Sequence, residues 1–190
     1  MALSYLGDCQ RIFPSDSRPL EQVLWKIVTT NPVSQHRLQA FRLYRSIADS
    51  EEAVQRLYTL WQERKAPKDC ALSESDYIGL SYMLAMHLPE KADKIIATQL
   101  SRIQNPDRKK EYQFISPSVS PRKAERDSVF ASLLIAGNRR VEPWASSALA
   151  NLNHRLREQE SVAYIRLALE AMSEVQRTGC LLYTSDAADD

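Results

Sequence analysis

Histidines, paired carboxylates and basic runs are the side chains of this sequence with the greatest chemical potential. A hydrolytic zinc site needs two histidines one helical turn apart beside a glutamate base, the pattern H-E-x-x-H, and the sequence lacks it. His36, His87 and His154 are far apart in the chain, so we interpret them as surface or helix-capping residues. The G-x-S-x-G turn of serine hydrolases and the phosphate-binding P-loop are missing too. We therefore predict no catalytic residue and no metal ligand in this chain.

Basic residues are concentrated between Arg102 and Arg157, where eleven Lys or Arg stand against five Asp or Glu. The runs are Arg108-Lys109-Lys110, Arg122-Lys123, Arg139-Arg140 and Arg155-x-Arg157. With Tyr112 and Phe114 close to the first run, such a field could bind nucleic acid, through charge and base stacking, or anionic peptide termini. Phe114 also falls where a helix needs core residues, which makes nucleic acid the weaker alternative.

The elements that must position these residues are helices. Asn31-Pro32, Asn105-Pro106 and Ser120-Pro121 combine a capping side chain with a proline suited to a first helical turn, and Leu88-Pro89 and Glu142-Pro143 are similar. The spacings Asp49-Ser-Glu-Glu52 and Ser73-Glu-Ser-Asp76 are typical of a capping box. These starts predict about nine helices.

Apolar residues recur at intervals of three and four along each predicted helix, and no strand-like alternation competes with them. Examples are Leu20, Val23, Leu24 and Ile27; Val54, Leu57, Tyr58 and Trp61; and Val162, Ile165, Leu169 and Met172. Because successive starts are close together, consecutive helices should fold back on each other. We predict an all-α fold, an irregular α-solenoid of antiparallel HEAT-like helix pairs, with a compact bundle as the alternative.

Length and hydrophobic content, 190 residues and 44%, suit one domain, which we place at residues 1–179. Residues 180–190 resemble translated sequencing adapter, so we treat them as a non-native tail and expect the helical region to be incomplete at both ends. Cys9, Cys70 and Cys180 have no disulfide or zinc spacing. The sequence shows no signal peptide and no apolar run long enough to span a membrane, and it leaves the location of the protein undetermined.

A series of short motifs resembles the C-terminal helical domain of bacterial aminopeptidase N-type zinc metallopeptidases (gluzincins), especially those of Bacteroidetes-type bacteria. The motifs occur in order over residues 72–179, whereas residues 1–71 fit only in helical pattern. They are Leu72 to Tyr77, Arg102 to Arg108, Arg126-Asp127 with Phe130, Asn138 to Trp144, Leu152 to His154 with Leu156-Arg157, Tyr164-Ile165, and Glu174 to Gly179. Arg155 departs from the proline expected after His154.

The resemblance implies an architectural role. In such enzymes this domain encloses the chamber through which peptides reach a catalytic domain, which lies upstream in the same polypeptide and holds the zinc. No motif of that catalytic domain occurs here, so we expect no cofactor in this chain and no activity from it alone. Arg139 and Arg140 are our candidates for binding peptide carboxylates in the chamber. The resemblance is compatible with a parent protein in the periplasm or cell envelope.

Two other functions stay open on sequence grounds. A freestanding helical scaffold that binds a protein partner would need no upstream catalytic domain. A nucleic-acid-binding solenoid would bind with a steep dependence on salt.

Overall fold

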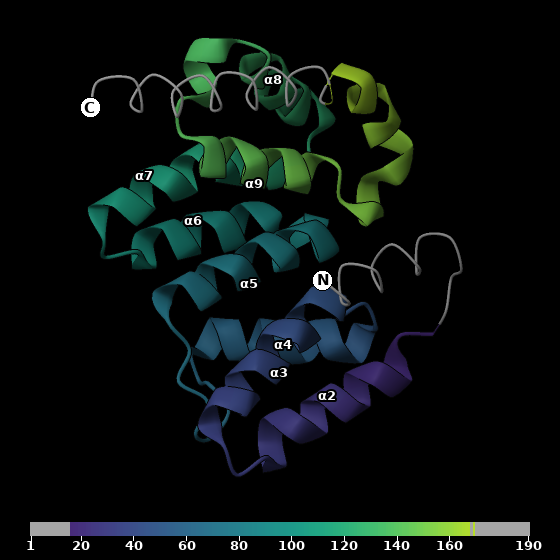
Figure 1. The fold of residues 1–190 in the computed structure, drawn as a ribbon, viewed down its shortest axis with the longest axis vertical. Helices are drawn as coiled ribbons and strands as arrows, with labels where there is room; N and C mark the ends of the chain where they lie inside the picture. Colours follow the sequence, from purple (N-terminus) through teal and green to yellow (C-terminus); the bar gives the residue numbers. More distant parts are fainter. Residues whose placement is uncertain (1–15, 168, 170–190) are drawn as a thin grey trace, which may run out of the picture. The chain divides into compact units, whose positions relative to one another are not determined.

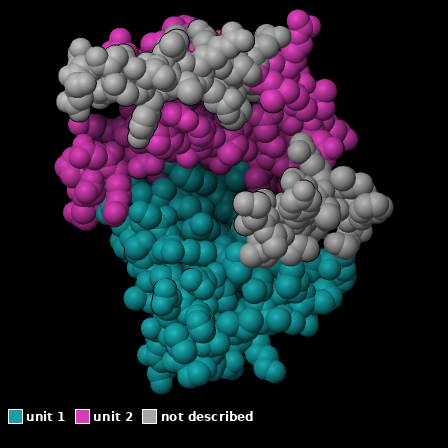
Figure 2. Space-filling view, viewed as in Figure 1, with its two compact units in different colours: residues 1–103 teal, residues 104–190 magenta. Residues whose placement is uncertain are grey.

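A computed structural model describes residues 16–167 and residue 169, and these residues are all-helical (Figure 1). The contacts divide the chain into two compact units, residues 1–103 and 104–190, which Figure 2 distinguishes by colour. The elements of unit 1 are α2 (Arg18–Thr30), α3 (Ser34–Ile47), α4 (Glu51–Glu63), α5 (Glu74–His87), the 3₁₀ turn η1 (Pro89–Lys91) and α6 (Ala92–Arg102). Those of unit 2 are α7 (Pro106–Ile115), η2 (Ser116–Val119), α8 (Lys123–Leu133), η3 (Ala136–Arg139), α9 (Glu142–Leu152), η4 (Arg155–Arg157) and a helix over 158–167.

The prediction of an all-helical protein is therefore confirmed. The described part of the chain holds nine α-helices, counting the one that begins at residue 158, and contains no strand. The HEAT-like solenoid and the single domain over residues 1–179 stay predictions. The predicted tail, residues 180–190, and the cysteines Cys9 and Cys180 lie outside the described residues.

In unit 1, α2 packs on α3, and α5 packs on both α4 and α6. Their apolar stripes meet in a core whose largest fully buried side chains are Phe41, Tyr44, Leu57, Leu80, Leu84 and Ile95. Burial of side chains of this size, about 1.5 to 3 kcal/mol each, is the main stabilising contribution. Of the stripe predicted for α4, Val54, Leu57 and Trp61 are buried, whereas Tyr58 is only half-buried.

In unit 2, α9 packs against α7, η2 and α8. The core here consists of Phe130, Leu133, Ala145, Ala148, Leu149, Leu152 and Tyr164, with Phe114 and Val129 packed against its edge. Tyr164 reaches this core from the helix 158–167 and stacks on Phe130, the two ring centroids being 4.5 Å apart. An aromatic pair at this distance contributes about 0.5 to 1.5 kcal/mol beyond the burial of its surface.

The helix 158–167 buries a different face from the predicted one. Ser161 and Tyr164 are buried, whereas Val162 and Ile165 are 62% and 43% exposed, so the prediction that Val162 and Ile165 face the core is wrong. The buried face carries Tyr164, which stacks on Phe130 and donates a hydrogen bond to Asp127. Met172, the last residue of the predicted stripe, lies outside the described residues.

Helix starts agree with the sequence at some positions and are displaced at others. The capping box at α5 is confirmed, because Ser73 Oγ accepts from the Asp76 amide at 3.2 Å and an Asp76 carboxylate oxygen accepts from the Ser73 amide at 3.0 Å. At Asn105-Pro106, Asn105 caps α7 as predicted. At Asn31-Pro32 and Ser120-Pro121 the helices begin two residues later than the proline, at Ser34 and Lys123.

The start of α4 differs more. Its N-cap is Ser50 rather than Asp49, and the accompanying carboxylate comes from Glu21 of α2. Glu21 is only 4% exposed and accepts from the amides of Asp49 and Ser50, at 2.8 and 3.0 Å, and from the hydroxyls of Ser17 and Ser50. A residue from another helix thus takes the role that the sequence pattern assigned to Glu52.

Candidate functional site

The basic region between Arg102 and Arg157 is the candidate site that the sequence singled out, and several of its arginines donate to the open carbonyls at helix ends. Arg102 shows the arrangement within unit 1. Its Nη1 and Nη2 donate to the carbonyl oxygens of Trp61 and Gln62, both at 2.9 Å, and its guanidinium lies 4.9 Å from the centre of the Trp61 ring. The last turn of α4 is therefore closed by a side chain from the end of α6.

Arg139 and Arg140, the predicted pair for peptide carboxylates, have different environments. Arg139 is 6% exposed, and its Nη1 donates to the Leu133 carbonyl at 2.6 Å, at the end of α8. Arg140 is exposed. The structure does not present the two side chains as one binding pair, and only Arg140 lies where a ligand from solution can reach it.

Two further arginines of unit 2 converge on the end of η2. Arg157 donates to the carbonyls of Ser118, Val119 and Ser120 at 2.7, 2.8 and 3.0 Å. Arg126, which is 4% exposed, donates to the Ser120 carbonyl at 2.8 Å and pairs with Glu160. Burial, and then the neighbouring charge of Arg126, lower the pKa of Arg157 to about 10, so it still carries its charge at neutral pH.

The other charged side chains at the start of α8 form ion pairs with residues three or four positions away in the sequence. Arg122 pairs with Glu125, and Lys123 Nζ lies 2.7 Å from an Asp127 carboxylate oxygen. Asp127 also accepts a hydrogen bond from the Tyr164 hydroxyl. Burial, and then this hydrogen bond, raise the pKa of Tyr164 to about 12. Arg126 and Asp127 thus both connect α8 to the helix 158–167, through Glu160 and Tyr164 respectively.

The aromatic residues beside the first basic run pack inside unit 2. Tyr112 is fully buried, and the Phe114 ring lies 5.8 Å from that of Trp144. Lys109 and Lys110 of the same helix are exposed. Base stacking by Tyr112 is therefore ruled out in this conformation, since its ring has no accessible face.

The buried carboxylates of unit 1 are saturated with donors. Arg42 contacts both oxygens of Asp76, at 2.8 and 3.2 Å, and Ser73 donates to it from its amide and hydroxyl. Burial alone would raise the pKa of Asp76, but these hydrogen bonds outweigh it and lower the pKa to about 2. Glu21 shows the same balance, with a pKa that its hydrogen bonds lower despite burial. Both are structural anions with a fixed charge at neutral pH.

Among the residues that the structure describes, no group of three or more His, Cys, Asp or Glu is arranged so that it could hold a metal ion. His154 caps η4, its Nδ1 accepting from the Leu156 amide at 3.4 Å, and His36 is exposed. Cys70 is buried with a free thiol, and burial raises its pKa.

Unit 2 contains an apolar groove of about 630 Å³. Phe114, Pro117, Val129 and Leu133 give it its apolar character, and Glu125 is its one charged lining residue. Such a groove can hold an apolar side chain, but it carries no set of groups for proton transfer or nucleophilic attack.

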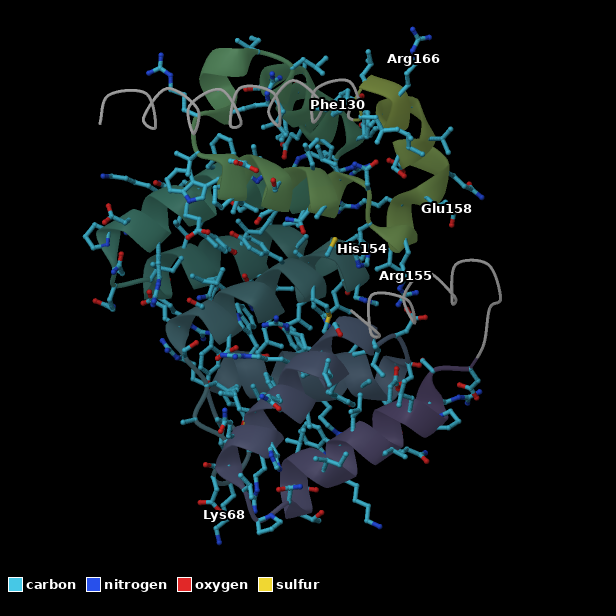
Figure 3. The ribbon with its side chains drawn as sticks, in the orientation of Figure 1. Lys68, Phe130, His154, Arg155, Glu158 and Arg166 are labelled. Atoms are coloured by element: carbon cyan, nitrogen blue, oxygen red, sulfur yellow. The ribbon has the colours of Figure 1, made fainter. Side chains whose placement is uncertain are left out.

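Sequence reasoning missed the main use of these arginines. It treated the basic excess as a surface field, whereas Arg102, Arg126, Arg139 and Arg157 each donate to a main-chain carbonyl. The available signal was the position of Arg102 at the end of a predicted helix, but its acceptors lie 40 and 41 residues earlier in the chain. Figure 3 shows Arg166, on the last described helix, pointing outward, in contrast to these inward arginines.

The described residues thus define an all-helical protein whose polar groups chiefly serve packing and helix capping. Comparisons with family models, with curated proteins and with solved structures find no match for this chain. No helix among the described residues has both the length and the apolar character needed to cross a membrane.

Proposed function

We propose that this chain is the non-catalytic helical domain of an aminopeptidase N-type zinc metallopeptidase. In this proposal the domain encloses the chamber through which peptides reach the catalytic domain. That catalytic domain belongs to the same polypeptide, lies outside the chain described here and holds the zinc.

The observation that supports the proposal is the use the fold makes of the motif residues. Arg126, Phe130, Arg157 and Tyr164, all from motifs that resemble the peptidase domain, belong to one group of contacts around α8 and the helix 158–167. Asn105 and Ser73, from two other motifs, cap α7 and α5. Motif residues that serve packing and helix capping are what we expect of a structural, non-catalytic domain. The motif from Glu174 to Gly179 lies outside the described residues.

Arg140 is the residue that we propose for contact with peptide carboxylates, because it is exposed whereas Arg139 is buried against the Leu133 carbonyl. An exposed guanidinium on a chamber wall attracts the free carboxylate of a peptide and can bind it through two hydrogen bonds. Its effect should grow with peptide length, since only longer peptides reach from the catalytic centre to the wall.

Long-read sequencing of the source DNA on both sides of this reading frame tests the assignment. We expect the frame to open upstream into a segment encoding H-E-x-x-H and to continue beyond Gly179 without the adapter-like residues. A stop codon directly upstream of Met1, together with a genomic origin of residues 180–190, would overturn the peptidase assignment.

Kinetics of the full polypeptide test the role of Arg140. We expect Arg140→Ala to raise KM severalfold for long peptides and to leave KM for a single-residue amide substrate unchanged. Lys109→Ala removes one exposed charge elsewhere in unit 2 and serves as the matched control. An unchanged KM for long peptides in Arg140→Ala would remove this residue from the proposal.

A further inference from the structure

Three hollows that share lining residues follow α2 and α4 in unit 1, and we call them together the trough. Their volumes are about 460, 300 and 520 Å³. The first two share Arg18, Ser50 and Glu52 in their linings, and the last two share Trp25, Thr29 and Arg56. Because each helix has 13 residues, the trough is about 20 Å long.

One end of the trough is acidic. Its lining contains four carboxylates against one guanidinium. The carboxylates are those of Asp16, Asp49, Glu51 and Glu52, and the guanidinium is that of Arg18, whose Nε lies 2.8 Å from Asp16. Acids occur here because α2 and α4 both begin at this end, and helix N-termini favour negative side chains.

The middle of the trough is aromatic and held in place. The half-buried Trp25 ring lies 5.0 Å from the ring of Tyr44 beneath it, and the Arg56 guanidinium lies 4.8 Å from the centre of the Trp25 ring. Arg56 is itself fixed by a 2.9 Å hydrogen bond to the Tyr44 hydroxyl and by its ion pair with Glu52. The Trp25 side chain, half-buried between these two partners, is therefore already held in place when an apolar side chain enters the trough.

The other end of the trough is basic. Arg56, Lys65 and Lys68 line it with Glu63 as the one acid. The two lysines lie on the loop that follows α4, and Figure 3 shows Lys68 pointing outward from unit 1. This loop is anchored, because Arg37 Nη1 donates to the Lys68 carbonyl at 2.7 Å. The backbone that carries Lys68 is thereby held in place, and both lysine side chains are exposed.

We propose that this trough binds an extended peptide segment of a partner protein, with a basic residue at one end, an apolar side chain in the middle and an acidic residue at the other end. The charge complementarity and the aromatic floor carry the proposal, and a trough of this length accepts about six extended residues. The proposal goes beyond the enclosing role above and does not rest on it.

Binding of labelled peptides to the full 190-residue chain tests the proposal. The panel consists of peptides with two lysines at one end, two glutamates at the other and Leu, Phe or Tyr between them, measured by fluorescence anisotropy. We expect at least one member to bind with a dissociation constant in the micromolar range, and more weakly as salt is raised. A panel in which no peptide binds overturns the proposal.

Reversing the charge of the basic end tests the orientation in which the peptide binds in the trough. In the double variant Lys65→Glu with Lys68→Glu, we expect the bound peptide to lose at least tenfold in affinity and a peptide with lysines at both ends to gain. The double variant Lys109→Glu with Lys110→Glu makes the same charge change on α7 and should alter neither affinity. Equal losses in the two double variants would reduce the effect to net charge and overturn the proposal.

Tryptophan emission locates the contact. Trp25→Phe keeps an aromatic floor and removes one of three indoles, so the emission change that peptide causes in the unmodified chain should disappear in this variant. Self-association of the chain that competes with the peptide would instead assign the trough to a second copy and overturn the assignment to a partner protein.

Discussion

The guanidinium of Arg45 occupies the space that a side chain at position 79, a glycine, would fill. A Cβ at position 79 would lie 2.4 Å from Arg45 Nη1 and 2.9 Å from its Cζ. The same Nη1 donates to the Asp76 carbonyl at 3.2 Å, and burial lowers the pKa of Arg45. Glycine at position 79 of α5 therefore makes room for a charged side chain from α3.

Gly79→Ala tests this close approach. Alanine is favoured over glycine in a helix by about 1 kcal/mol, so an unobstructed substitution would stabilise the protein. We expect instead a loss of about 1 kcal/mol in the free energy of unfolding, because the new methyl group displaces the guanidinium from its acceptor. In an Arg45→Ala background the same substitution should become stabilising. Urea unfolding of the four proteins measures this reversal, and a stabilising effect in the unmodified chain would contradict it.

Asp76→Asn should make the free energy of unfolding less dependent on pH in the acidic range. The pKa of Asp76 is depressed to about 2, so its stabilising contribution is present above its unfolded pKa near 3.8 and is lost as the pH falls toward 2. We expect Asp76→Asn to cost about 1 to 2 kcal/mol at pH 7 and much less near pH 2. Urea midpoints measured across this range give the comparison, and a loss of constant size would indicate that the carboxylate charge is unimportant.

Arg157→Lys should destabilise unit 2 although it keeps the charge. The guanidinium donates to three carbonyls around the end of η2, and the compact ammonium group of lysine lacks the planar fork of donors that this geometry needs. We expect a loss of about 2 kcal/mol. Arg140→Lys, at an exposed position, is the matched control and should change stability by less than about 0.5 kcal/mol. Similar losses at both positions would refute the capping role.

Tyr164→Phe keeps the ring on Phe130 and removes the hydroxyl that donates to Asp127. The raised pKa of about 12 means that the contribution of this hydroxyl is present below pH 10 and is lost as the pH rises through 12. In an ultraviolet titration of tyrosinate, the variant should lack the component that ionises near pH 12. A titration curve unchanged at its alkaline end would show that the hydrogen bond does not form.

Local signals in the sequence were sufficient for the helical class and for part of the helix boundaries. Ser73 with Asp76, and Asn105 before Pro106, are short-range patterns, and the structure uses both as predicted. Glu21 could not be predicted, because it caps α4 from 28 and 29 residues away. Long-range pairing of this kind leaves no mark in a local window.

The candidate site was harder to predict than the helices. Arg139 and Arg140 look alike in sequence, yet one is buried on a carbonyl and the other is exposed, because η3 ends at Arg139 and turns the next residue outward. The trough between α2 and α4 combines Trp25 with Arg56, and no periodicity in either helix reveals that the two side chains meet.

The hydrogen bonds of Arg102 set an order for assembly on the ribosome. The carbonyls of Trp61 and Gln62 lie at the end of α4, and their donor is synthesised about 40 residues later. While the chain emerges from its amino end, those two carbonyls can be satisfied only by water. Docking of α6 then releases that water and closes α4, so the last residues of unit 1 complete a helix made long before them.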